Sequence, residues 1–130
     1  MAHWAELDEN NIVLRVTVGD NNDPSGDEGY QWLIDNLGGR WTKTSYNTKE
    51  GVHLLGGTPL RKNFAAPGYY YNEDLDAFIP PKLYPSWIFN EEKCIYEPSK
   101  PNPSDGKVYY WDEFSQNWYP EPKGRFVWNF

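Results

Sequence analysis

The stretch that decides the fold is residues 69–120, in which one pattern occurs three times. It runs aromatic, any residue, aromatic, Asn or Asp, Glu, four more residues, aromatic, any residue, Pro. The copies are Tyr69-Tyr70-Tyr71-Asn72-Glu73 with Phe78-Ile79-Pro80, Trp87-Ile88-Phe89-Asn90-Glu91 with Tyr96-Glu97-Pro98, and Tyr109-Tyr110-Trp111-Asp112-Glu113 with Trp118-Tyr119-Pro120. Because their internal spacing is identical, we expect the three segments to share one local structure.

Each copy is predicted to form a β-hairpin. Asn or Asp opens a turn, because its side chain can accept a hydrogen bond from the backbone two residues further on. The closing proline ends the strand pairing, because it has no N–H to donate. Aromatic residues seven apart then face each other across the hairpin, which predicts the pairs Tyr71 with Phe78, Phe89 with Tyr96, and Trp111 with Trp118. The two-residue period of a strand adds Tyr69, Trp87 and Tyr109 to the same faces.

Proline-rich segments, residues 80–85 and 98–103, separate the copies and are expected to be extended and semi-rigid. A single two-stranded hairpin is only marginally stable in water, so these hairpins must pack on something. Two interpretations stay open: the aromatic faces form the core of a small β-domain, or they meet another protein or a sugar. On the second, the candidates for an interface or for ligand stacking are Tyr71, Phe78, Trp87, Phe89, Tyr96, Trp111 and Trp118.

Upstream of the repeat, residues 1–68 are predicted to form a small α+β domain, and residues 69–130 the aromatic hairpin-repeat region. The segment from His3 to Val18 is typical of a hairpin with a turn at 8–11 and a second strand rich in β-branched residues. Alternation along that strand predicts that Leu14, Val16 and Val18 share one face, with Val13, Arg15 and Thr17 on the other. The whole chain is therefore expected to be mainly β with one short helix: an N-terminal hairpin and helix, then three aromatic hairpins on proline-rich linkers.

The helix is predicted over residues 26–38. Ser25 and Glu28 stand at capping-box spacing, and Gly38-Gly39 supplies a stop signal. Apolar residues recur between these signals at helical spacing and predict a stripe that packs on the N-terminal hairpin, with Trp41 closing the small core. The stripe comprises Tyr30, Leu33, Ile34 and Leu37.

Composition favours a folded but acidic protein. Hydrophobic residues make up only 38% of the 130 residues and mean hydropathy is -0.84, values that by themselves are typical of disorder. The aromatic fraction of 18% argues for folding, because Trp, Tyr and Phe bury large areas. With a net charge of -7 and no basic stripe, nucleic acid is not an expected partner. Arg61 and Lys62 form one small basic spot, a candidate for contact with a partner or for pairing with nearby acids.

The chain lacks the motifs of common catalytic and metal sites. Its two histidines, His3 and His53, have no metal-ligand spacing, and no Gly-x-Ser-x-Gly or phosphate-binding loop is present. The acidic loop at 20–27 does not match the EF-hand pattern. The single cysteine, Cys94, is expected to be a small buried hydrophobe. We expect no enzymatic activity, no cofactor and no metal.

No apolar run approaches the length of a membrane span, and the N-terminal residues lack an apolar signal segment. We therefore expect synthesis in a host cytoplasm and no membrane insertion.

Several runs in the chain resemble a known family. They are Thr44-Ser45-Tyr46-Asn47-Thr48, Gly51-Val52-His53, Leu60-Arg61-Lys62-Asn63-Phe64-Ala65, Gly68-Tyr69, Asp76-Ala77-Phe78-Ile79-Pro80-Pro81-Lys82 and Ser86-Trp87. In these runs the chain resembles small virion structural proteins of marine tailed phages, cyanophages especially, from about Thr44 to Trp118. One departure is Lys49-Glu50-Gly51, where that family tends to have Arg-Gly-Gly. The resemblance implies a virion component and carries no catalytic residues; the N-terminal third lies outside it.

Two hypotheses follow from the resemblance and the aromatic repeat. The first is a capsid decoration or cement protein on the head exterior, whose partners are other virion proteins. The alternative is a tail- or fibre-associated adhesion module whose aromatic residues stack on host surface glycans. Both place the protein in the virion.

Overall fold

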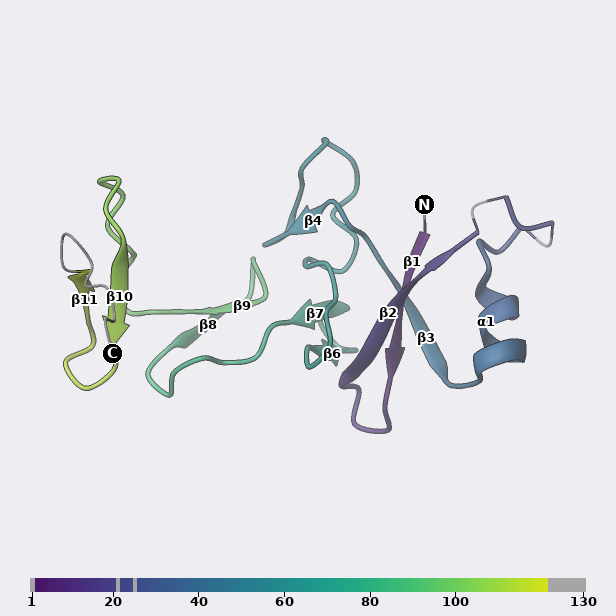
Figure 1. Ribbon diagram of the computed structural model, residues 1–130, viewed down its shortest axis with the longest axis horizontal. Coiled ribbons are helices and arrows are strands. Elements are labelled where there is room, and N and C mark those ends of the chain that lie inside the picture. The colour runs from purple at the N-terminus through teal and green to yellow at the C-terminus, as the bar shows by residue number, and fades with distance from the viewer. Residues whose placement is uncertain (1, 21, 25, 122–130) are drawn as a thin grey trace, which may run out of the picture. The chain divides into compact units, whose positions relative to one another are not determined.

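The computed structural model describes residues 2–20, 22–24 and 26–121 (Figure 1). The fold is mainly β with one short helix, which confirms the predicted class. The elements are β1 (Ala2–Leu7), β2 (Val13–Gly19), α1 (Tyr30–Leu37), β3 (Arg40–Thr44), β4 (Thr48–Lys49), β5 (Val52–His53), β6 (Tyr70–Asn72), β7 (Ala77–Ile79), β8 (Ile88–Asn90), β9 (Ile95–Glu97), β10 (Tyr109–Asp112) and β11 (Asn117–Pro120).

The chain divides into two compact units. The first comprises the described residues up to Pro81 together with Asn90–Ile95, and the second comprises Lys82–Phe89 and the described residues from Tyr96 onward. The sequence had suggested a division after Gly68; in the structure the first aromatic hairpin belongs to the N-terminal unit instead.

The first unit is built on an antiparallel sheet in the order β2-β1-β3 (Figure 1). In the β1–β2 register Glu6 lies opposite Arg15 but Leu7 lies opposite Val13, so Leu14 is an extra residue in a β-bulge. The bulge breaks the alternation predicted for this strand. Leu14 is exposed, whereas Val13, which alternation placed on the opposite face from Val16, is buried in the core with Val16 packed against it.

Helix α1 packs against one face of this sheet. The Trp4 and Tyr30 rings lie 5.2 Å apart, and the indole N–H of Trp41 donates to the Gly38 carbonyl oxygen at 2.7 Å. Trp41 is buried, as predicted, but of the expected apolar stripe only Leu33 is fully buried. Tyr30 and Leu37 remain partly exposed.

The helix is shorter than predicted, beginning at Tyr30 rather than at residue 26 and ending at Leu37. Ser25, half of the predicted capping box, lies outside the described residues. Its intended partner Glu28 binds the Lys43 ammonium at 2.6 Å. The first turn is held instead by the Asp27 carboxylate, which accepts hydrogen bonds from the backbone N–H groups of Gly29 and Gln31.

The opposite face of the sheet carries the core of the first unit, which consists of Ala5, Leu7, Val13, Ala65 and Phe78. Phe78 is the largest fully buried side chain and comes from the first aromatic hairpin, β6–β7. Two backbone hydrogen bonds join this hairpin to the N-terminal one: Val13 N–H donates to Tyr69 O, and Tyr71 N–H donates to Asn11 O, both at 2.8 Å. The first repeat copy therefore completes the N-terminal fold.

The segment Leu60-Arg61-Lys62-Asn63-Phe64 has a structural role. Buried Asn63 donates from its amide nitrogen to the carbonyl oxygens of Phe78, Lys93 and Cys94 at 2.9–3.1 Å, and its Oδ1 accepts from the Glu50 N–H at 2.9 Å. One side chain thereby ties the first aromatic hairpin to the turn of the second, which belongs to the same unit.

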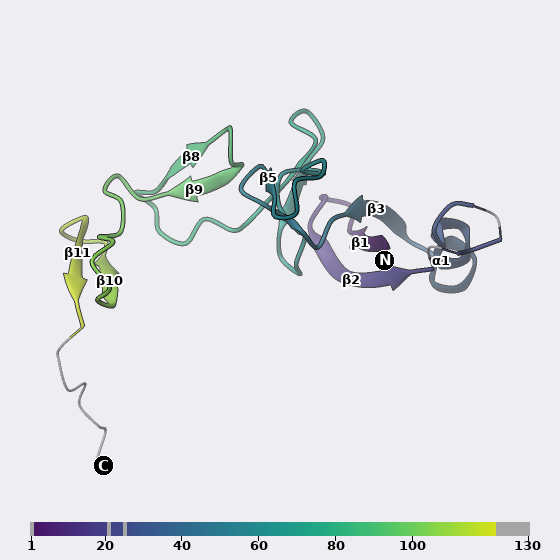
Figure 2. The same cartoon turned by 90° about the horizontal axis from the view of Figure 1, so that it is seen from above.

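The three repeat turns adopt one conformation. The residue before the second strand has a left-handed backbone in each copy, with φ of 49° at Asp76, 54° at Cys94 and 52° at Gln116. The opening Asn or Asp accepts a hydrogen bond from the backbone N–H three residues on in every copy, and also two residues on in the second. The predicted hairpins are confirmed; in Figure 2 the arrows of β10 and β11 run in opposite directions.

The predicted facing pairs are also confirmed. Tyr71 lies opposite Phe78 and Trp111 opposite Trp118 in the strand registers. The Phe89 and Tyr96 rings lie 5.2 Å apart.

Candidate interaction surface

The inner faces of the repeat in the second unit form an aromatic cluster. The Trp111 ring meets Trp118 at 5.3 Å and Trp87 at 6.1 Å, both edge to face, and Tyr84 meets Trp87 at 5.2 Å. Trp111 is only 6% exposed. Edge-to-face contacts of this kind add to the stabilisation from burial itself. Because the rings contact each other, this cluster is the core of the second unit.

Glu113, in the turn of the third hairpin, braces the cluster. Its carboxylate accepts hydrogen bonds from the Ser86 hydroxyl at 2.6 Å, the Ser86 N–H at 3.0 Å and the Trp111 indole N–H at 3.0 Å. The bonds from Ser86, followed by the bond from Trp111, lower the pKa of the Glu113 carboxyl below its usual range. These bonds fix the segment before Trp87 to the third hairpin.

Two of the predicted interface residues lie in the first unit, where Phe78 belongs to the core and Tyr71 packs against it. Phe78 is 0% exposed. Tyr71 is half-buried, and its hydroxyl donates to the Asp76 carboxylate at 2.5 Å. Burial, and then the bond to Asp76, raise the pKa of Tyr71. For these two residues the core interpretation holds.

Apart from buried Trp111, the remaining aromatic candidates are half-buried. Trp87 and Trp118 belong to the cluster of the second unit, and the Trp118 indole N–H donates to the Lys100 carbonyl oxygen at 2.7 Å. Phe89 and Tyr96 form their own pair, with the Lys82 ammonium 5.5 Å from the Tyr96 ring centre. Each therefore uses part of its surface within the fold.

The basic candidates are mostly accounted for by the fold. The Arg61 Nε lies 3.0 Å from the Asp76 carboxylate, and one guanidinium nitrogen donates to the Lys43 carbonyl oxygen at 3.0 Å. Lys62 is half-buried, and the two residues share a left-handed backbone with φ of 52° and 68°. Arg61 thus pairs with a nearby acid, which was one of the two roles expected of it.

Cys94 is 1% exposed, as expected of a small buried hydrophobe. Burial raises the pKa of its thiol. Both features keep the reactive thiolate scarce.

A pair of exposed aromatic side chains lies on the other side of the third hairpin. Tyr110 and Tyr119 face each other across β10 and β11, with ring centres 5.9 Å apart and planes inclined by 34°. They are 51% and 39% exposed. The Glu121 N–H donates to the Val108 carbonyl oxygen, so strand pairing continues to this residue. Strand alternation then places exposed Val108 on the same face as Tyr110. Phe114, in the turn, is 98% exposed. We call Val108, Tyr110, Phe114 and Tyr119 the outer surface of the third hairpin.

Sequence reasoning missed this surface because it treated the middle position of the aromatic-x-aromatic motif as unconstrained. That position is occupied by Tyr70, Ile88 and Tyr110, and all three side chains are exposed. The available signal was that a large apolar residue recurs at a position that strand alternation turns away from the paired aromatics.

Comparison with family models, curated proteins and solved structures finds no match. Within residues 2–20, 22–24 and 26–121, no helix has the length and apolar character needed to cross a membrane, and no cluster of three or more His, Cys, Asp or Glu side chains could hold a metal ion.

Proposed function

We propose that this protein is a phage virion structural protein, a capsid decoration or cement protein bound to the head exterior through the outer surface of its third hairpin. The observation that carries the proposal is the exposed Tyr110–Tyr119 pair on β10 and β11, in a hairpin whose turn also carries Phe114 at 98% exposure. The resemblance to marine phage virion proteins, which runs through the repeat, supplies the virion context.

The outer surface has the character of a protein-binding patch. Aromatic side chains dominate the energetics of protein interfaces when they are anchored in pockets of a partner. Here the inner face of the same hairpin is fixed by the Trp111 contacts and by Glu113, so little ordering entropy would be lost on binding. Phe114 and Val108 have no polar side-chain group with which to select sugar hydroxyls, which favours an apolar protein surface as the partner.

The alternative function is a tail- or fibre-associated adhesion module that binds host glycans. The moderately inclined Tyr110–Tyr119 pair favours it, because flat exposed rings can stack on the C–H face of a sugar. The sequence offered Trp87, Trp111 and Trp118 among its candidates for ligand stacking. Burial of Trp111 moves the stacking role to the two tyrosines.

Quantitative mass spectrometry of purified virions tests the location. A decoration protein occupies symmetry-repeated head sites, so a copy number on the order of hundreds per particle is expected. A copy number of about six or twelve points to the tail and contradicts the decoration role. Absence from purified particles contradicts both hypotheses.

Substitution of the outer surface tests the contact. Tyr110→Ala combined with Tyr119→Ala is expected to reduce the number of copies retained on particles by about tenfold or more, the effect of losing interface anchors. The matched control is Leu54→Ala with Leu55→Ala, two exposed apolar residues of the first unit. Equal retention of both double variants would show that the outer surface of the third hairpin does not hold the protein on the particle.

A further inference from the structure

A cavity of about 270 Å³ in the first unit lies between the end of β2 and the start of α1. The side chains that line it are apolar or acidic: Val18, Trp32, Leu33, Asp20 and Asp23. Its volume lies just below the range of about 300–1,000 Å³ that is typical of pockets for drug-sized ligands, so it suits a single side chain. None of these residues takes part in the outer surface of the third hairpin.

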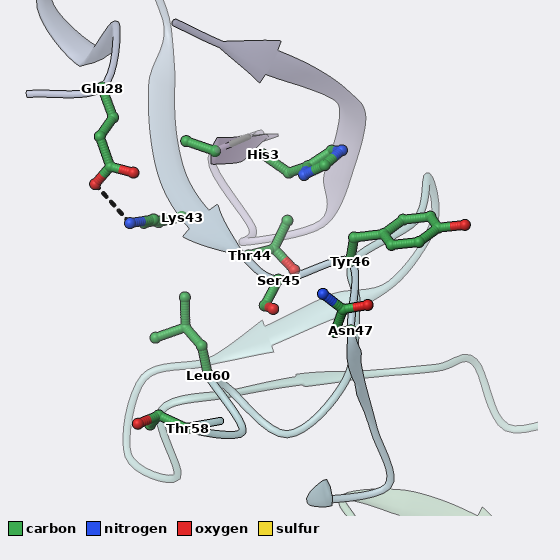
Figure 3. Close-up of a pocket in the computed structure, with 10 residues that line it drawn as sticks. His3, Glu28, Lys43, Thr44, Ser45, Tyr46, Asn47, Thr58 and Leu60 are labelled. Carbon is green, nitrogen blue, oxygen red and sulfur yellow. Dashed lines mark hydrogen bonds and ion pairs between the residues drawn. The ribbon is translucent and has the colours of Figure 1, made fainter. Parts of the chain in front are cut away.

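The two walls of the cavity are fixed to each other. A Cβ atom added at Gly19 would lie 2.2 Å from the Glu28 carbonyl oxygen, and one added at Gly29 would lie 3.3 Å from the Gly19 Cα, so the two backbones are in contact. The indole N–H of Trp4 donates to the same Glu28 carbonyl oxygen at 3.1 Å. The Glu28 carboxylate in turn binds the Lys43 ammonium at 2.6 Å (Figure 3). Because the walls are held in place, little further ordering is needed when a ligand binds.

The apolar part of the cavity has a buried floor and an open aromatic wall. Leu33 is only 2% exposed and lies at the bottom, whereas Val18 and Trp32 are 49% and 56% exposed and lie nearer the mouth. The aliphatic stem of a long charged side chain packs well on such a surface. Its cationic head is attracted to the face of an indole ring.

The charge of the lining is negative and is not compensated. Its described residues include no lysine, arginine or histidine. Within residues 2–20, 22–24 and 26–121, no cationic side chain forms an ion pair with Asp20, whose carboxylate accepts a hydrogen bond from the Asn22 N–H at 2.9 Å. The positive end of α1 already faces the Asp27 carboxylate, which caps its first turn. The cavity therefore attracts a cation and repels an anion.

We propose that this cavity receives the side chain of an arginine from a partner protein. The guanidinium stacks on Trp32 and pairs with Asp20, and Asp23 adds to the negative charge around it. The aliphatic stem packs on Val18 and Leu33. Arginine fits better than lysine, because its flat head group both stacks on aromatic rings and binds carboxylates through two parallel hydrogen bonds.

Other occupants fit this lining less well. An apolar side chain would bury the carboxylates without a partner, which costs free energy. A metal ion would lack ligands, because no group of three or more His, Cys, Asp or Glu side chains in the described part of the chain could hold one. The inference stands apart from the proposed virion role, because it rests on different residues in the other unit.

The test is an NMR titration of the full-length, ¹⁵N-labelled protein with N-acetyl-arginine methylamide, which presents the side chain without charged termini. N-acetyl-citrulline methylamide has nearly the same shape but no charge and is the matched probe. The arginine probe is expected to bind with a dissociation constant on the order of 1–10 mM, and the citrulline probe about threefold to tenfold more weakly. The shifted amide signals should map to residues 18–20, 29 and 32–33. Absence of these shifts with the arginine probe overturns the proposal, as does equal affinity for the two probes.

The same spectra distinguish a partner protein from a second copy of this chain. Without any probe, the amide signals of residues 18–20, 29 and 32–33 should keep their positions when the protein is diluted. Movement of these signals with protein concentration would show that a second copy fills the cavity, and it would contradict a separate partner.

Variants separate binding from folding. Trp32→Ala is expected to weaken binding of the arginine probe by about threefold to tenfold, and Asp20→Asn, which keeps the shape but removes the charge, by about twofold to fivefold. The matched controls are Tyr46→Ala and Asp74→Asn, an exposed aromatic and an exposed acidic residue elsewhere in the first unit, and both should leave binding unchanged. A dispersed spectrum for every variant shows that it folds. Equal affinity in Trp32→Ala and the unsubstituted protein contradicts the proposal.

Discussion

The first and third aromatic hairpins share one sequence pattern and one turn conformation, yet they differ in how much of each hairpin is buried. In the first, β7 is buried on both faces, with Ala77 and Phe78 each 0% exposed. In the third, only the inner face is buried, through Trp111, while Tyr110 and Tyr119 on the other face remain exposed. The spacing of the repeat thus sets the hairpin, and the residues between the paired aromatics set how much of it is buried.

The difference follows from the residues at matching positions. The outer positions of the second strand are Ala77 and Ile79 in the first hairpin, and Asn117 and Tyr119 in the third. Small and aliphatic side chains can be buried without polar partners, whereas Asn and Tyr carry groups that favour solvent or an amphipathic interface. The first hairpin is therefore a core element, and the third can serve for binding.

The largest expected effect comes from making the same Phe→Ala substitution in the first and in the third hairpin. Phe78→Ala should lower the free energy of unfolding of the first unit by about 3–5 kcal/mol, because it leaves a cavity in a packed core. Phe114→Ala, the same change at a 98% exposed side chain, should alter stability by no more than about 0.5 kcal/mol. Chemical denaturation of both variants measures the two values. Similar losses would contradict the assignment of one hairpin to the core and the other to the surface.

The paired aromatics and the turns were predictable because they depend on contacts a few residues apart. The particular acid that Arg61 pairs with and the elements that Phe78 packs against were not, because Asp76 and the β1–β2 hairpin are distant from them in sequence. The alternation predicted for β2 fails at Leu14, because a β-bulge shifts it by one residue. In the third hairpin, the candidates Trp111 and Trp118 lie on the face that packs within the fold. Spacing alone could not decide between the core and the interface interpretation of that face.

An intermediate effect is expected from pH, through Glu113. The pKa of its carboxyl is lowered in the folded protein, so its contribution to stability is present above the ordinary value of 4.5 and is lost as the pH falls through the lowered, folded-state pKa. The near-ultraviolet circular dichroism of the tryptophan cluster should decrease over that acidic range.

Glu113→Gln should remove this acid transition, since the amide does not titrate there. Glu73 occupies the same repeat position in the first hairpin, and Glu73→Gln is the matched control that should leave the tryptophan signal and its acid transition unchanged. An unaltered acid transition in Glu113→Gln would show that another group controls the cluster.

The smallest effect is expected at the left-handed turn residues. Gln116→Gly should stabilise the third hairpin by about 0.5–1 kcal/mol, because glycine adopts a positive φ without steric cost. Asp76→Gly, the same change at the matching position of the first hairpin, should be destabilising, because Asp76 binds the Tyr71 hydroxyl and Arg61. Thermal unfolding measures the two changes in stability, which should have opposite signs. Stabilisation by both would mean that the Asp76 contacts contribute little.

Hydroxyl-radical footprinting of the full-length protein, read by peptide mass spectrometry, tests the contrast between the hairpins most directly. Phe78 and Phe114 have the same intrinsic reactivity, so their labelling rates report their accessibility alone. The account predicts rapid labelling of Phe114 and Tyr110, with Phe78 and Trp111 protected until the protein unfolds. Labelling of Phe78 as fast as that of Phe114 in the folded protein would contradict it.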